Sequence, residues 1–169
     1  MSTGDKHMVK DMTDYFVGEK QESMLFMLVA LMAMGLAVWL WTHGHRLRFM
    51  ALPLVVVALM QLVVGVTIFT RTDAQLTKLS TQLASAPAQF KQAETERMQT
   101  VMANFKLYKT VELALLVVGA CLIAFLSQWD AATGIGIGLV VQAGFTLALD
   151  LFAEARGEVY LGALAGIAA

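Results

Sequence analysis

The stretch that decides the fold spans residues 113–149 and reads LALLVVGACLIAFLSQWDAATGIGIGLVVQAGFTLAL, with Asp130 as its one charged residue. Glu112 and Asp150 flank it, and its two charge-free parts contain 17 and 19 residues. At about 1.5 Å per residue, each part covers most of a hydrocarbon core of roughly 30 Å, allowing for flanking residues. A helix satisfies its own backbone hydrogen bonds in lipid, and both parts are longer than the ~10 residues of a barrel strand. The stretch therefore predicts two transmembrane helices joined by a short turn.

Two further charge-free runs, residues 23–41 and 50–69, have the same character. The whole chain is 58% hydrophobic and 15% charged, whereas a soluble domain is about 45–50% apolar and about 25% charged. Trp39, Trp41 and Trp129 stand at run ends, where an aromatic belt lies. The formal net charge of -1 and the single cysteine give no support for a nucleic-acid binder or a disulfide scaffold. We predict an all-α, polytopic membrane protein with a bundle of four transmembrane helices.

A polar connection, residues 72–109, lies between the second and third predicted helices. Apolar residues recur at helical spacing, and Ser85-Ala86-Pro87 supplies a helix stop followed by a new start, because proline is tolerated in a first turn. This pattern predicts an extramembrane helical hairpin. Its second arm has no breaker before Trp129, so it is expected to continue into the third transmembrane helix for about 65 Å. One face of that arm is expected to meet a partner, and it carries Phe90, Val101, Phe105, Tyr108 and Glu112.

The sequence divides into five predicted segments. They are an N-terminal amphipathic segment (1–22), transmembrane helices one and two (23–71), the hairpin (72–109), transmembrane helices three and four (110–152) and a C-terminal helical tail (153–169). The N-terminal segment carries Met8, Met12, Tyr15 and Phe16 at helical spacing and is expected to lie on the membrane or against the hairpin. The apolar end of the tail is too short to span, so it is expected to pack on the hairpin or on another subunit.

Four spans place both termini and the hairpin on one side of the membrane. The cationic residues of that side include Lys10, Lys20, Arg71, Lys78, Lys91, Arg97, Lys106, Lys109 and Arg156, whereas the short loops hold Arg46 and Arg48. Counting Lys and Arg places the termini and the hairpin in the cytoplasm of a bacterial-type inner membrane. The reversed orientation stays open, because the hairpin side is rich in acids and the first short loop is purely basic.

Charged residues gather at the membrane boundary on the hairpin side. They are Glu19, Glu22, Arg71, Lys109, Glu112, Asp150, Glu154 and Arg156. One interpretation is an acid-lined vestibule for a cation or a proton, since ionisable groups near hydrocarbon need a partner or water. The other is a set of interfacial salt bridges, in which Arg71 and Arg156 hold Glu112 and Asp150 and fix the hairpin on the bundle.

A row of small and polar residues follows the fourth predicted helix at four-residue spacing. Its members are Gly134, Gly138, Gln142, Thr146, Asp150 and Glu154. Small residues along such a ridge let another helix approach closely. A second interpretation is a polar path, in which Gln142 and Gln61 meet near the middle of the bundle and connect Thr146 to the acids. A hydrogen bond between the two glutamines would satisfy both without transport.

Two classes of function follow. The first is a small channel or carrier for a cation or protons. Its expected site residues are Glu112, Asp150, Glu22, Glu154, Arg71, Gln61, Gln142 and Thr146. The second is a non-catalytic assembly, immunity or regulatory subunit whose hairpin binds a protein partner. An enzyme comes third, because no catalytic motif is present. No cofactor or nucleic acid is expected. A metal site on the side of the acids would have only one histidine ligand, His7. The glycine row, the hairpin and the tail favour a homo-oligomer in the lipid bilayer.

Overall fold

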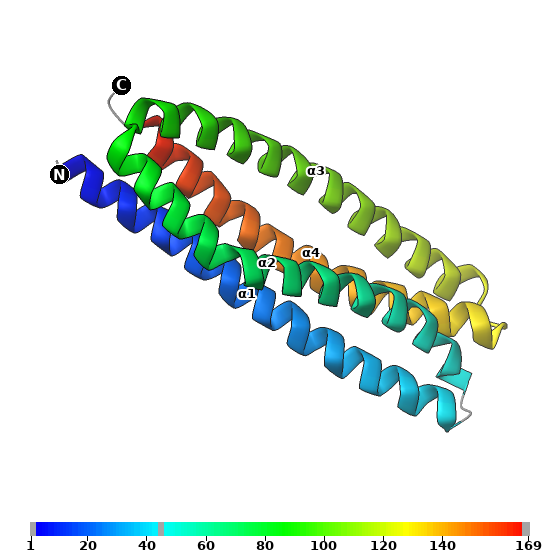
Figure 1. The fold of residues 1–169 in the computed structure, drawn as a ribbon. Coiled ribbons are helices and arrows are strands. Elements are labelled where there is room, and N and C mark those ends of the chain that lie inside the picture. Colours follow the sequence, from blue (N-terminus) through cyan, green and yellow to red (C-terminus); the bar gives the residue numbers. More distant parts are fainter. Residues whose placement is uncertain (1–2, 44–45, 167–169) are drawn as a thin grey trace.

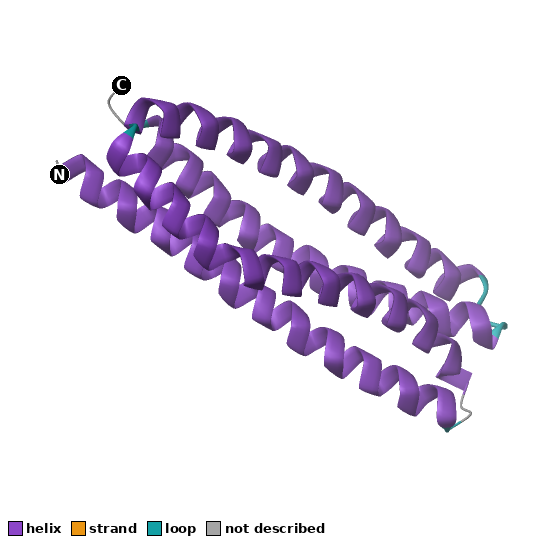
Figure 2. Cartoon of the chain, in the orientation of Figure 1, coloured by secondary structure: helices purple, strands orange, loops and turns teal. Residues whose placement is uncertain are grey.

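The computed structural model describes residues 3–43 and 46–166, and the chain forms four long α-helices and one 3₁₀ helix (Figure 1). The elements are α1 (Thr3–Thr42), η1 (Arg46–Met50), α2 (Ala51–Ser85), α3 (Pro87–Phe125) and α4 (Asp130–Ala165). Each α-helix is long and apolar enough to cross a membrane. Figure 2 shows only helices and short connections in the part of the chain that the structure describes. The prediction of an all-α chain with four helices suited to a membrane is confirmed.

The helices run antiparallel to their chain neighbours. The start of α1, the α2–α3 turn and the end of α4 lie at one end of the bundle, which we call the hairpin end (Figure 1). The α1–α2 and α3–α4 connections lie at the other end, the short-loop end. α1 packs along α2, and α3 packs along α4, while α4 also contacts α1, η1 and α2. The molecule is therefore two helix pairs joined mainly through α4.

The α2–α3 turn lies where the sequence predicts it. α2 ends at Ser85, and α3 begins at Pro87. The Ala86 backbone N–H donates to the Gln82 carbonyl (2.8 Å), and the Phe90 N–H donates to the Ala86 carbonyl (3.0 Å). Proline tolerates the first helical turn because its missing N–H has no partner there in any case. α3 then runs unbroken for 39 residues and ends at Phe125, four residues before the expected Trp129.

A buried apolar cluster fills the hairpin end, and all four helices contribute to it. Its buried members, which we call the hairpin-end core, are Met8, Met12, Tyr15, Phe16, Leu79, Leu83, Phe90, Met98, Tyr160 and Leu164. The Tyr15 and Tyr160 rings are stacked with their centroids 4.8 Å apart. The N-terminal segment thus packs against the hairpin, one of its two predicted positions, and α4 continues straight into the predicted tail, whose residues 167–169 lie outside the described part.

The hairpin arms do not stand alone at this end. α1 and α4 flank them, and none of the four helices breaks at the segment boundaries expected after residues 22, 71, 109 and 152. Each span and its extension are one helix because no glycine–proline or polar breaker interrupts the pattern. On the face of α3 expected to meet a partner, Phe90 and Glu112 are buried, while Tyr108 is about half exposed.

Small residues determine the packing in the apolar half of the bundle. Ala30, Ala33 and Ala37 of α1 are buried against Ala51 and Ala58 of α2. On α3 and α4, a Cβ added at Gly119 would lie 2.8 Å from the Gly136 carbonyl oxygen, and one added at Gly136 would lie 2.8 Å from the Gly119 carbonyl oxygen. Such close backbone approach is typical of small-residue contacts between membrane helices.

Candidate functional site

Six of the eight charged residues at the boundary form ion pairs between helices. Arg71 of α2 pairs with Glu19 of α1 (Nη2–Oε1, 3.2 Å). Lys109 of α3 pairs with Glu154 of α4 (Nζ–Oε2, 2.5 Å). The third pair, Arg156 with Glu22, is described below. These pairs connect α1 to α2, α3 to α4 and α4 to α1, so they hold the helices together at one level of the bundle.

Arg156 of α4 reaches across α1 to Glu22. Its Nη1 and Nη2 donate to the two carboxylate oxygens at 2.7 and 2.6 Å, which is the bidentate arrangement that suits a guanidinium. The Arg156 side chain passes over Gly18, where an added Cβ would lie 2.8 Å from it. Glycine at this position therefore gives the arginine its route to Glu22. Both side chains are largely shielded from solvent.

This pairing differs from the one expected from sequence, in which Arg71 and Arg156 hold Glu112 and Asp150. The reason is the packing of whole helices. α1 lies against both α2 and α4, so the α1 carboxylates Glu19 and Glu22 are the acids within reach of the two arginines. Arg71 is consequently the partner of Glu19 and is not available to Glu112 or Asp150.

Glu112 is the acid at this level that is buried without a counter-charge. Its residue is 8% exposed, and its Oε2 is buried without a hydrogen-bond partner. Among the side chains that the structure describes, those of residues 7–43 and 46–166, no lysine or arginine lies within ion-pair distance of it. Thr146 and Asp150, one turn apart on α4, are the neighbours that act on its carboxyl group. An acid in this setting needs a positive charge that the described chain does not supply.

Asp150 lies between Glu112 and the paired acids. It is partly buried, and the negative charges that act on its carboxyl group are those of Glu22 and Glu154. Each of those two glutamates has its own cation, Arg156 and Lys109. Asp150 itself forms no ion pair within the described ranges. Glu112 and Asp150 are thus two neighbouring carboxyl groups without cations, surrounded by pairs that are already satisfied.

Two buried glutamines continue the polar row toward the middle of the span. Gln142, on α4, is 3% exposed, and its Nε2 has no partner. Gln61, on α2, is buried, and both its Oε1 and Nε2 lack partners. The hydrogen bond between the glutamines that the sequence suggested is therefore not formed. The Thr146 hydroxyl donates to the Gln142 backbone carbonyl (3.0 Å), and it is also the side chain of α4 that hydrogen-bonds with the Glu112 carboxyl group of α3.

Beyond the glutamines, tight contacts fill the short-loop half of the bundle. A Cβ added at Gly138 would lie 2.4 Å from Pro53 Cγ, and one added at Gly134 would lie 3.0 Å from the Met50 backbone nitrogen. The glycine row of α4 is thus used within the chain, against η1 and α2. The Gly119–Gly136 contact lies on the other side of α4, so in this half of the bundle α4 packs closely against both α3 and the η1–α2 segment.

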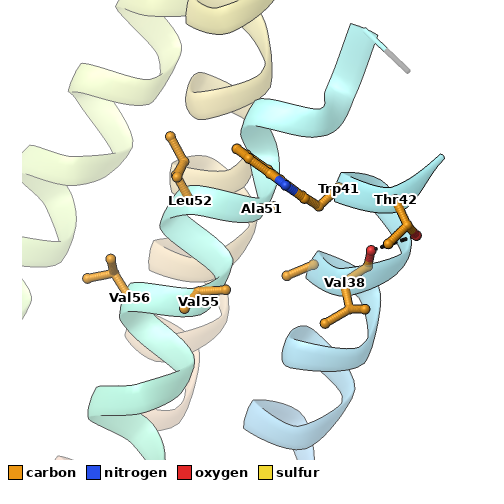
Figure 3. Close-up of a pocket in the computed structure, with 8 residues that line it drawn as sticks. Val38, Trp41, Thr42, Ala51, Leu52, Val55 and Val56 are labelled. Atoms are coloured by element: carbon orange, nitrogen blue, oxygen red, sulfur yellow. Dashed lines mark hydrogen bonds between the residues drawn. The ribbon is translucent and has the colours of Figure 1, made fainter. Parts of the chain in front are cut away.

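The surface groove between α1 and α2 is of a different kind. Figure 3 shows it at the short-loop end, where Trp41 reaches from α1 toward α2 and the lining includes Val38 of α1 and Leu52, Val55 and Val56 of α2. The Thr42 hydroxyl in this view donates to the Val38 carbonyl of its own helix (2.9 Å). The groove is apolar, opens on the outside of the bundle and does not reach the acids. It suits lipid chains.

Sequence reasoning missed a buried polar network at the hairpin end. Glu94 of α3 is 2% exposed and accepts two hydrogen bonds from Arg97, at 2.8 and 2.6 Å, and one from the Tyr160 hydroxyl at 3.1 Å. The signal that could have revealed it is the i,i+3 spacing of Glu94 and Arg97 on the face that carries Phe90. All its groups are satisfied, so this network is a structural link between α3 and α4.

No metal site is indicated among the described residues, because no three His, Cys, Asp or Glu side chains gather closely enough. Comparison with known proteins adds no name: no family model, no curated protein and no solved structure matches the chain. The function must therefore be argued from Glu112, Asp150, Thr146, Gln142 and Gln61.

Proposed function

We propose that this chain is an integral membrane protein that binds a cation, most simply a proton, at Glu112 and exchanges it with the hairpin end. We further propose that it resides in a bacterial-type inner membrane with the hairpin end in the cytoplasm, as the excess of Lys and Arg at that end favours. In this proposal, the part of the bundle beyond the charge-free spans, including the helical hairpin, lies outside the membrane.

The observation that carries the proposal is the buried, unpaired carboxyl group of Glu112. Breaking a buried ion pair by removing one partner costs about 3–5 kcal/mol, which shows how costly an uncompensated charge is. The neighbouring glutamates Glu19, Glu22 and Glu154 each form an ion pair with an arginine or lysine of the chain. Glu112 has no such cation, and its Oε2 atom has no hydrogen-bond partner. A bound cation or proton removes this cost, and an ionisable group within a membrane bundle is by default a candidate functional site.

The buried glutamines support access from one side only. Unsatisfied buried amides cost about 1–3 kcal/mol each unless water or a ligand pairs with them. Gln142 and Gln61 together offer three such atoms, which water entering past Asp150 and Thr146 would satisfy. The glycine contacts close the short-loop half, so the geometry favours a carrier-type site at one face over an open channel through one chain.

Proton flux into proteoliposomes tests this proposal directly. The protein is reconstituted with an entrapped pH-sensitive dye, and a potassium diffusion potential drives the flux. We expect flux from the wild type and less than a tenth of it from Glu112→Gln, because the amide cannot carry the proton; this is a loss worth about 1.4 kcal/mol or more. The matched control is Glu96→Gln, an exposed carboxylate on the same helix, which should leave the flux unchanged. Equal flux from both variants would refute the role of Glu112.

The second candidate is a non-catalytic assembly or regulatory subunit that binds a protein through the hairpin. The three interhelical ion pairs and the tight glycine contacts favour it, because both are devices for fixing helices in place. In this case the wild type carries no flux of protons, Na⁺ or K⁺. Wild-type flux above that of protein-free liposomes therefore distinguishes the two candidates before any variant is made.

A further inference from the structure

The exposed face of α4 carries a continuous apolar stripe. Its members recur with alternating steps of four and three residues, which is the spacing of a coiled-coil seam. This α4 stripe consists of Val141, Phe145, Ala148, Phe152, Ala155, Val159 and Gly162. All are exposed except the half-buried Phe145, and Phe152 and Val159 are each 70% exposed. The stripe covers three heptads, about 31 Å of helix.

Lipid cannot cover the outer part of this stripe in the proposed membrane position. Val159 lies nine residues beyond Asp150, which is about 13 Å along the helix and past the level of the ion pairs. A contiguous apolar helix face in that position is typical of a surface that binds another protein. No described residue covers the outer end of the stripe, since a Cβ added at Gly162 would meet no atom within 4 Å.

The chemistry of the surrounding surface identifies the occupant as a second copy of the same stripe. The other helices expose mainly polar residues at the hairpin end, such as Lys10 and Asp14 on α1 and Thr77 and Lys78 on α2. Their large exposed apolar residues in this region are Val17 of α1 and, next to the boundary on α3, Leu107, Tyr108 and Val111. An uncharged stripe in one copy therefore finds its apolar counterpart in the same stripe of another copy.

The stripe also has the shape that self-association requires. Phe145, Phe152 and Val159 alternate with Ala148, Ala155 and Gly162 along the seam. In a parallel pair in register, layers of Phe and Val then alternate with layers of Ala and Gly, whose small side chains let the two helices approach closely. Two copies in one membrane have the same orientation, so a two-fold axis along the membrane normal brings two α4 helices together in parallel and in register.

We infer that the chain forms a symmetric dimer in which the α4 stripes of two copies pack as a parallel pair, from within the span to Gly162. This inference does not depend on cation binding at Glu112. Of the surfaces expected from sequence, it uses the tail and the adjoining span rather than the glycine row, because Gly134 and Gly138 contact η1 and α2 of their own chain.

Disulfide formation by single cysteines tests this geometry, because a parallel two-fold pair places each seam residue opposite itself. Ala155→Cys is made in a Cys121→Ser background, since Cys121 is the one native cysteine. We expect oxidation in dilute lipid to convert most Ala155→Cys protein to covalent dimer. The control, Ala93→Cys, is an exposed alanine of α3 at the hairpin end and should stay monomeric. Equal dimer yields from the two variants would overturn the inference.

The number of copies per lipid nanodisc supplies a second measurement. We expect two copies for the wild type and a dimer weakened by about tenfold or more for Val159→Glu, because a charge is then buried in the seam. Val159 is exposed in a single copy, so this variant should keep the helical content and thermal stability of the wild type. One copy per nanodisc for the wild type would assign the stripe to a different protein and refute self-association.

Discussion

Two glutamates at the same level of the bundle, the partly buried Glu22 and the buried Glu112, illustrate the two roles that an acid can have in a membrane protein. Glu22 accepts both arms of the Arg156 guanidinium, and its charge is matched within the chain. Glu112 has a buried carboxyl oxygen with no partner. Since both are glutamates at one boundary, their different surroundings separate a structural ion pair from a site that remains open to a ligand.

Replacing each glutamate with glutamine should change stability differently. Glu22→Gln leaves Arg156 without its counter-charge and should lower the free energy of unfolding by about 2 kcal/mol, in the range for hydrogen bonds to charged groups. Glu112→Gln removes a charge that has no partner and should leave stability unchanged or slightly higher. Thermal unfolding in one mild detergent compares them.

Asp73→Asn provides the control for this comparison. Asp73 pairs with Lys20 at 2.6 Å, but its side chain is 75% exposed, so its loss should cost about 0–1 kcal/mol. If Glu112→Gln proves as destabilising as Glu22→Gln, Glu112 has a structural partner, and the site proposed here is wrong.

At the site, the sequence predicts the identity of the residues but not their pairing. The acids at the boundary and the mid-span glutamines stand out because charged and amide groups are rare in such runs. Which cation meets which acid depends on the distance between residues far apart in sequence, such as Glu22 and Arg156. That distance is set by how α1 lies against α4, and no local pattern determines it.

At the scale of elements, the seam between α3 and α4 is formed by backbone rather than by side chains. Gly119 and Gly136 each lie against the other's carbonyl oxygen, and the Leu116 side chain lies 3.9 Å from a Cβ added at Gly144. Close approach of two helices lets many atoms contact along their length, which is the main source of helix association in lipid. The seam therefore depends on the absence of a single methyl group at each position.

Adding that methyl group should separate the helices. Gly119→Ala places a Cβ 2.8 Å from the Gly136 carbonyl oxygen, and a backbone atom cannot move aside as a side chain can. We expect a loss of about 1–3 kcal/mol in stability, the range for overpacking. Gly35→Ala on α1 is the control, because its Cβ would meet no atom within 4 Å. It should be neutral or stabilising by up to about 1 kcal/mol, since alanine is the better helix former. Equal melting temperatures for the two variants would contradict this description of the seam.

The elements themselves are largely predictable from the sequence. Charge-free runs mark the spans because ionised side chains are excluded from hydrocarbon, and Pro87 marks the α2–α3 turn through its missing N–H. The position of the N-terminal part of α1, which continues the first span as one helix, could not be predicted from such local signals. Met12 and Phe16 indicate an amphipathic helix, but the same pattern fits a membrane surface or a protein surface. Only the neighbouring Tyr160 and Phe90, distant in sequence, decide between them.

The whole molecule combines a core shared by four helices at the hairpin end with two helix pairs at the short-loop end. The antiparallel order of the four helices places the start of α1, the α2–α3 turn and the end of α4 together (Figure 1). The two short connections are joined by an ion pair between Arg46 and Asp130 at 2.7 Å, which offsets one of their two arginines. The hairpin end keeps the larger number of Lys and Arg residues, which favours a cytoplasmic position.

Labelling with a membrane-impermeant maleimide should reveal this topology. Ser85→Cys at the α2–α3 turn and Gln128→Cys in the α3–α4 connection are exposed positions at opposite ends, each placed in a Cys121→Ser background. On intact bacterial cells without an outer membrane, Gln128→Cys should react at once and Ser85→Cys only after the cells are opened, because the reagent cannot cross the bilayer. If Ser85→Cys reacts at once and Gln128→Cys only in opened cells, the hairpin end faces outward. The proposed orientation would then be wrong, but the four spans would remain. Reaction of both positions from the same side would be incompatible with four helices crossing the membrane, since an odd number of spans separates the two ends.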